Sequence, residues 1–188
     1  MKLQHKTVLI TGGTSGIGFE LARQLRQKGN TVIVTGRDQA RLDIARRTLP
    51  DIHVFQSDVS EPDAIAALSD RVLARFPALD TLVNNAGIMR NLNLNRDHDL
   101  SDVTREIDIN LSGPVRMIQQ FLPHLKTRSN ALTVNVTSGL AFVPFPASPV
   151  YCATKAALHS FAQSLRAQLE THRRLVGPIG GSAATSYR

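Results

Sequence analysis

The chain has 188 residues, of which 42% are hydrophobic and 20% are charged, so its composition indicates a globular domain rather than a disordered chain. The formal net charge of +7 is spread along the sequence, and we therefore expect no nucleic-acid partner. A lone cysteine, Cys152, excludes an internal disulfide framework, and no Cys/His spacing predicts a metal site. No apolar run reaches the ~18 residues that span a bilayer, and none near the start suits a signal segment, so we expect a cytoplasmic protein without a membrane partner.

A glycine-rich turn follows the first predicted strand, which covers residues 7–10, and precedes a segment with helical periodicity. Glycines without a Cβ allow a tight turn, so that backbone N–H groups and the positive end of the helix can approach a pyrophosphate. The spacing Gly-x3-Gly-x-Gly differs from the commoner Gly-x-Gly-x-x-Gly pattern. The turn still predicts a dinucleotide site, made by Gly12, Thr14, Ser15, Gly16, Ile17 and Gly18.

The second predicted strand, residues 31–35, is β-branched throughout and is followed by Gly36. In dinucleotide-binding folds an acidic residue near this point accepts a hydrogen bond from the free ribose 2′-hydroxyl, whereas an arginine pairs with a 2′-phosphate. Arg37 therefore favours NADP over NAD as the cofactor. The neighbouring Asp38 argues mildly for NAD, although it is better interpreted as the cap of the next helix.

Strand and helix patterns alternate along the rest of the chain, which predicts an α/β fold with a doubly wound parallel sheet covered on both faces. We expect a single domain over residues 1–172. The Gly/Ser/Ala-rich segment 173–188 has no strand or helix pattern and predicts an irregular tail. The further strands are expected at 52–56, 79–83 and 131–137, and the helices at 38–49, 62–75, 102–126 with a kink at Gly113-Pro114, and 151–170.

Tyr151 and Lys155 lie one turn apart at the start of the last predicted helix, so their side chains share a face. A lysine ammonium close to a phenol favours the phenolate, which suits a general acid/base. Ser138 follows the fifth strand and could hold a substrate oxygen near Tyr151. Tyr-x-x-x-Lys alone is common on ordinary helices, but together with the dinucleotide turn and the serine it favours a catalytic site.

In order and spacing, these motifs resemble those of the short-chain dehydrogenase/reductase family, over residues 7 to about 170. The resemblance implies a Rossmann-type fold and an enzyme that transfers a hydride between NADP, or possibly NAD, and a small carbonyl or alcohol substrate. The matching motifs are Thr11-Gly12-x3-Gly16-Ile17-Gly18, Asp58-Val59, Asn84-Asn85-Ala86-Gly87, Asn110, Ser138 and Tyr151-x3-Lys155.

The resemblance also implies roles for single residues. Tyr151 would be the acid/base and Ser138 would orient the substrate oxygen. Lys155 would bind the nicotinamide ribose and favour the phenolate, and Asn110 would support a water-linked proton relay. Contacts to the cofactor are further implied for Asp58 and Val59 at the adenine, and for Asn85, Ala86 and Gly87 along the cleft. We interpret Asn84 as more structural than Asn85.

Family members ordinarily continue after the Tyr-Lys helix into a further strand, a substrate lid, a helix and a last strand. The resemblance therefore implies that the usual C-terminal part is lacking, which would expose one sheet edge and open the nicotinamide half of the site. An alternative function is that of an impaired remnant that binds nucleotide or self-associates without turnover. The helices that begin near Asp102 and Tyr151 pair across subunits in the family, which implies a homodimer or homotetramer.

Overall fold

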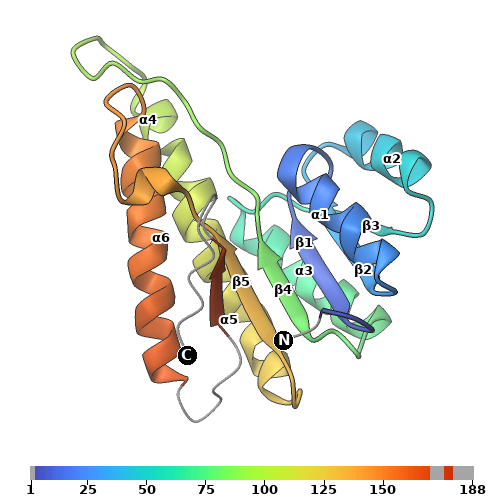
Figure 1. Cartoon of the computed structure of the whole chain (residues 1–188). Coiled ribbons are helices and arrows are strands. Elements are labelled where there is room, and N and C mark those ends of the chain that lie inside the picture. Colours follow the sequence, from blue (N-terminus) through green and yellow to red (C-terminus); the bar gives the residue numbers. More distant parts are fainter. Residues whose placement is uncertain (1–2, 170–175, 180–188) are drawn as a thin grey trace.

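The computed structural model describes residues 3–169 and 176–179, and its core is one parallel sheet with helices on both faces (Figure 1). The strand order is β3-β2-β1-β4-β5-β6, so the chain turns back past β1 after β3 and extends the sheet in the other direction. This is the predicted doubly wound α/β fold. The strands are β1 (Thr7–Thr11), β2 (Thr31–Gly36), β3 (His53–Gln56), β4 (Thr81–Asn84), β5 (Leu132–Val136) and β6 (Val176–Ile179).

Alternate side chains of β1 enter two different cores. Val8 and Ile10 pack in the core beneath α1 (Gly16–Gln27) and α2 (Gln39–Thr48), and Leu9 packs in the core beneath α3 (Pro62–Arg75) and α5 (Gly113–Lys126). All three side chains are completely buried. A strand covered on both faces needs apolar residues at every position, which is why this segment reads as a continuous apolar run.

The helix predicted over 102–126 is interrupted one turn earlier than Gly113-Pro114 suggests. α4 (Leu100–Ile107) passes into a π-helical turn, η1 (Asp108–Ser112), and α5 begins only at Gly113. A Cβ at Gly113 would lie 2.9 Å from the carbonyl oxygen of Val59, so the close approach of this helix to the loop after β3 requires glycine. The π-helical turn holds Asn110, which is completely buried.

The segment after α6 (Pro149–Gln168) differs in part from the expectation of an irregular tail over 173–188. That expectation is wrong at Val176–Ile179, which form β6 in parallel register with β5; the other residues of the segment lie outside the described part. The short run is broken by Gly177-Pro178, so its pattern carries no strand signal, and pairing with β5 decides its conformation. The edge of β5 that was expected to be exposed is therefore paired. Among the described helices, none is long and apolar enough to cross a bilayer.

Candidate active site

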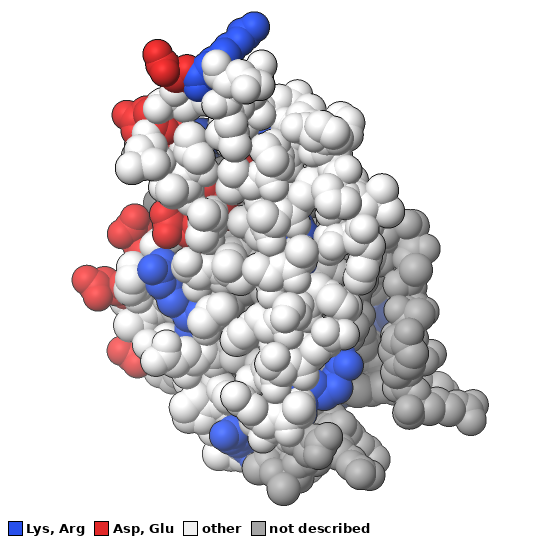
Figure 2. Space-filling view, turned by 90° about the vertical axis from the view of Figure 1, so that its left-hand side faces the viewer, with Lys and Arg blue, Asp and Glu red and all other residues white. Residues whose placement is uncertain are grey.

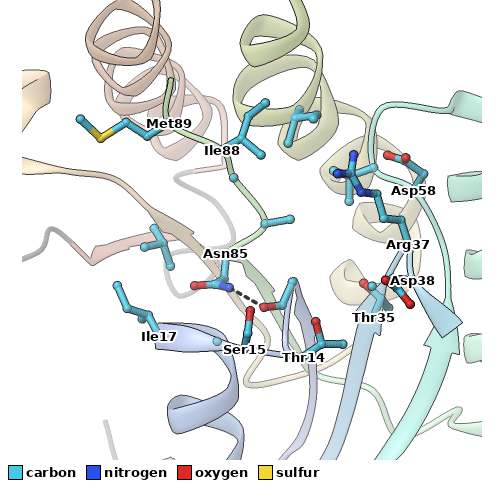
Figure 3. A pocket seen from close by; sticks show the side chains of 18 of the residues that line it. Thr14, Ser15, Ile17, Thr35, Arg37, Asp38, Asp58, Asn85, Ile88 and Met89 are labelled. Atoms are coloured by element: carbon cyan, nitrogen blue, oxygen red, sulfur yellow. Dashed lines mark hydrogen bonds between the residues drawn. The ribbon is translucent and has the colours of Figure 1, made fainter. Parts of the chain in front are cut away.

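A cavity of about 500 Å³ lies where the carboxyl ends of the parallel strands meet the start of α6. It is lined by the turn after β1, by the segments that follow β2, β3, β4 and β5, and by the first turns of α6 (Figure 3). Of the predicted cofactor residues, Gly16 does not line this cavity. Those that do are Gly12, Thr14, Ser15, Ile17, Gly18, Arg37, Asp58, Val59, Asn85, Ala86, Gly87, Tyr151 and Lys155.

The turn after β1 is tightly packed at Gly18. A Cβ at Gly18 would lie 2.4 Å from the carbonyl oxygen of Gly12 and 2.3 Å from Asn85 Nδ2, so no side chain fits there. Asn85 lies beside this turn (Figure 3), and its Nδ2 donates to the carbonyl oxygens of Thr11 at 3.0 Å and Gly12 at 3.1 Å. Asn85 therefore holds the shape of the turn as well as lining the cavity.

The N-terminal end of α1 is open to an anion. Within the described part of the chain, the capping residue Ser15 makes no side-chain cap hydrogen bond, and the first turn of α1 holds no acidic residue. A Cβ at Gly16 would meet no atom within 4 Å, so space lies in front of the helix end. Free N–H groups and the positive helix end favour a phosphate. These residues fit the pyrophosphate of a dinucleotide.

Basic side chains lie at another end of the cavity, after β2 and in the first turn of α2. Asp38 caps α2 by accepting a hydrogen bond from the Arg41 backbone at 3.2 Å, which confirms its interpretation as a helix cap. Its carboxylate also lies 3.7 Å from Arg41 Nε. Arg37 also lines the cavity and has no ion-pair partner among the described residues (Figure 3). Asp58 is held by Ser60, whose backbone and hydroxyl both donate to it, at 2.9 and 2.8 Å.

Tyr151 and Lys155 line the same cavity from α6. Lys155 Nζ lies 5.7 Å from the centre of the Tyr151 ring and donates a hydrogen bond to the carbonyl oxygen of Val136 at 2.8 Å. Only 4% of Lys155 is exposed, and burial lowers the pKa of its ammonium group to about 8. The expected pairing of a phenol with a nearby lysine is thus present at the wall of the cavity.

Asn110 and Ser138 do not line the cavity, and their predicted catalytic roles remain predictions. Asn110 Oδ1 accepts from the Ile88 backbone at 2.8 Å, while its Nδ2 donates to the Ile88 carbonyl at 2.8 Å and to Thr154 Oγ1 at 3.3 Å. Ser138 Oγ accepts from the backbone of Leu140 at 3.2 Å. Both side chains therefore shape the backbone around the cavity in this structure.

Asn84 is a structural residue, as interpreted from the sequence. It is buried, and its Nδ2 donates to Asn135 Oδ1 at 2.9 Å, which joins β4 to β5 below the cavity. Cys152 is likewise buried, and the backbone of Phe145 donates to its sulfur. Among the described residues, no group of His, Cys, Asp and Glu side chains could hold a metal ion.

Several lining residues were not predicted. Most of them lie at the carboxyl ends of strands or within a few residues after them, and the rule that ligands bind at the carboxyl ends of parallel strands could have found them. Arg41 and Ile109 come from helices, and no sequence pattern points to them. The unpredicted residues are Thr35, Gly36, Asp38, Arg41, Ser57, Ile88, Met89, Ile109, Val136 and Thr137.

Sequence relatives share most of this chain. The protein described as uncharacterized oxidoreductase DltE of Bacillus subtilis is 48% identical over 170 residues, which are 90% of this chain and 68% of that protein. The 11-beta-hydroxysteroid dehydrogenase-like 3 protein of Arabidopsis thaliana is 31% identical over 186 residues, or 96% of this chain and 60% of that protein. The chain thus spans roughly two thirds of the length of these two relatives.

Solved structures share the fold closely. A metagenomic short-chain oxidoreductase in complex with NADP is 27% identical, with a TM-score of 0.88 over 96% of this chain and 84% of that one. A protein described as a putative betaketoacyl-ACP reductase is 33% identical, with a TM-score of 0.84 over 95% of this chain and 73% of that one. The sequence model described as short chain dehydrogenase matches residues 6–179. The chain therefore belongs to the short-chain dehydrogenase family, whose oxidoreductases use NAD or NADP with small-molecule substrates.

Proposed function

We propose that the chain is an NADP(H)-dependent oxidoreductase that acts on a small carbonyl or alcohol, with Tyr151 as the acid/base. One observation carries this proposal: Tyr151 and Lys155 line the same cavity as the open, positive end of α1. A cavity that can hold a pyrophosphate at one place and offer a proton at another is suited to redox chemistry on a carbonyl. The NADP complex of the metagenomic relative supports the choice of cofactor class.

The chain's own residues would bind the cofactor, orient the substrate and transfer a proton to or from the substrate oxygen. When bound, the nicotinamide of NADP(H) would supply or accept the hydride. Lys155 keeps a cation close to the Tyr151 ring and would hold the nicotinamide ribose, while Tyr151 moves a proton to or from the substrate oxygen. Ser138 would hold that oxygen, and Asn110 would support the relay that returns the proton from solvent.

The preference for NADP follows from the basic end of the cavity. Arg37 lines it without an ion-pair partner in the described part of the chain, so its guanidinium is available to a 2′-phosphate. Asp38 could compete by binding a free 2′-hydroxyl, but its carboxylate already accepts from the Arg41 backbone and lies near the Arg41 side chain. The acid that would favour NAD is therefore engaged in capping α2.

We further propose a cytoplasmic homodimer or homotetramer. Figure 2 shows the face on the α4 and α6 side, across whose middle few charged side chains lie. Large exposed apolar side chains occur in this region, among them Leu100 and Ile107 of α4 and Phe142 in the loop after β5. A second copy would bury such a surface. Sedimentation equilibrium would return the mass of a single chain if this proposal is wrong.

The direct test of the reaction is to mix the chain with NADPH and a panel of small aldehydes and ketones. NADPH oxidation is measured as the loss of nicotinamide absorbance. We expect turnover by the natural chain and a loss of at least about 100-fold in Tyr151→Phe, because the phenol is the proton donor. NADPH binding should persist in that variant. A chain that binds NADPH but reduces no carbonyl would support the alternative of nucleotide binding without turnover.

A further inference from the structure

A buried carboxylate beside the active site has no place in the mechanism above. Glu106, in the last turn of α4, is completely buried. Its Oε1 accepts a hydrogen bond from the backbone of Arg90 at 2.6 Å, and its Oε2 has no hydrogen-bond partner among the described residues. Burying a carboxylate costs free energy unless hydrogen bonds or an opposite charge compensate for the lost water. We therefore expect the buried carboxylate of Glu106 to stabilise a neighbouring group.

Glu106 lies on α4 one helical turn before Asn110, whose Nδ2 donates to Thr154 of α6. Burial raises the pKa of the Glu106 carboxyl, while the Arg90 backbone, the Arg90 charge and the backbone N–H of Tyr151 oppose that rise. α4 packs against α6, with α4 beside the end of α6 that carries Tyr151 (Figure 1). The carboxylate thus lies between the segment after β4 and the first turn of α6.

The start of α6 lacks a cap of its own. Among the described residues, its capping residue Ser148 makes no side-chain cap hydrogen bond, because the hydroxyl donates to Asn91 Oδ1 at 3.1 Å instead. The first turn of α6 also contains no acidic residue. The first N–H groups of a helix need an acceptor and favour a negative charge. The buried carboxylate of Glu106 is on α4, the helix that packs against this end of α6.

Asn110 makes a parallel connection one turn further along the chain. It joins Ile88 to Thr154 of α6, and Glu106, one turn earlier, accepts from the Arg90 backbone. Two residues of extended chain and one helical turn cover similar distances, so Glu106 lies level with the first turn of α6, which carries Tyr151.

We propose that Glu106 is a positioning residue: its buried carboxylate, bonded to the backbone after β4, sets a negative charge against the first turn of α6 and so fixes Tyr151 against the bound substrate. This inference rests on the proposed function, because it assigns Glu106 a role in that reaction. Glu106 does not line the cavity, so it acts through the backbone of Tyr151 and not on the reacting atoms. A displacement of about 1 Å in a reacting group can lower a rate by two orders of magnitude.

The test compares Glu106→Gln with Asp102→Asn. Both substitutions remove a carboxylate of α4 that contacts Arg90. Glu106 accepts from the Arg90 backbone, whereas the exposed Asp102 accepts only from the Arg90 side chain, through its Oδ1 at 2.8 Å and its own carbonyl oxygen at 3.2 Å. We expect Glu106→Gln to lower kcat at least about 10-fold with little change in the NADPH dissociation constant. Asp102→Asn should leave both values near those of the natural chain. A kcat of Glu106→Gln equal to that of Asp102→Asn would overturn the proposal.

Hydrogen exchange gives a second readout that does not need turnover. The amides of the first turn of α6 should exchange faster in Glu106→Gln than in Asp102→Asn, whereas those of β1 should not differ. Unchanged exchange in α6 would overturn the link even if no carbonyl is reduced, and a natural chain without turnover would refute the proposed function alone. If Glu106→Gln does not fold, Glu106→Asp replaces it in the test. The shorter side chain keeps the negative charge but moves it away from α6, so we expect the same lower kcat and the same faster exchange in the first turn of α6.

Discussion

The buried ammonium group of Lys155 links the catalytic wall of the cavity to the stability of the chain. Within the described part of the chain, its one hydrogen bond goes to the carbonyl oxygen of Val136, a neutral acceptor, and burial lowers its pKa from 10.5 to about 8. The folded chain therefore releases this proton at a lower pH than the unfolded chain. Between these two values the unfolded state binds more protons, so the free energy of unfolding rises as the pH rises.

This sign gives a testable pH dependence. From about pH 8 to pH 10.5, the natural chain should gain stability relative to Lys155→Met, because the penalty for burying the charge disappears as Lys155 loses its proton. The full difference corresponds to roughly 3 kcal/mol. Urea unfolding of both proteins across this range measures it, and the variant corrects for every other group that titrates there. A constant difference between the two curves would contradict the buried charge.

At the scale of elements, two glycines in the turn between β1 and α1 are required for different physical reasons. Gly18 is needed for packing, since a Cβ there would lie within 2.4 Å of Gly12 and Asn85 atoms. Gly16 has a φ of +53° but open space around it, so a side chain there would be strained without a clash. Gly18 thus allows the turn to pack tightly, and Gly16 allows the backbone to adopt a positive φ.

Replacing each of these glycines with alanine should therefore have different effects. Gly18→Ala should lower the free energy of unfolding by about 1–3 kcal/mol, because the turn must open to admit the methyl group. Gly16→Ala should cost only about 1 kcal/mol for its backbone conformation, yet it should weaken NADPH binding because the strained residue shifts the first N–H groups of α1, which would hold the pyrophosphate. Urea unfolding and NADPH titration of both variants separate the two effects. Natural NADPH affinity in Gly16→Ala would place the phosphates elsewhere.

The sequence predicts elements well where a periodic pattern is long, and poorly where neighbours decide the conformation. The apolar runs of β1 and β2 identify both strands because the helices on each face leave no polar position. The π-helical turn at Asp108–Ser112 carries no signal of its own, since it arises where Gly113 approaches Val59. Val176–Ile179 became a strand only through pairing with β5. Long-range contacts of this kind are absent from local patterns.

At the scale of the whole molecule, the sheet order explains why the site residues could be predicted from motifs far apart in the sequence. Most of the motifs follow a strand, and parallel strands bring their carboxyl ends to one edge, where the cavity lies and where Tyr151 and Lys155 enter from α6. The contribution of Arg41 and Ile109 could not be predicted, because it depends on how two helices lie over that edge. Glu106 was missed for the same reason, since its neighbours Arg90 and Tyr151 come from other segments.

Titration of the purified chain with NADPH and NADH shows whether this cavity binds NADP(H) through the end of α1 and Arg37. Nicotinamide fluorescence should show saturable binding of both with a preference for NADPH, and Arg37→Leu should reduce that preference by about 10-fold or more, because an arginine–phosphate contact is lost. NADH binding should hardly change in that variant. A folded chain that binds neither nucleotide, or binds NADH as tightly as NADPH, would contradict the account.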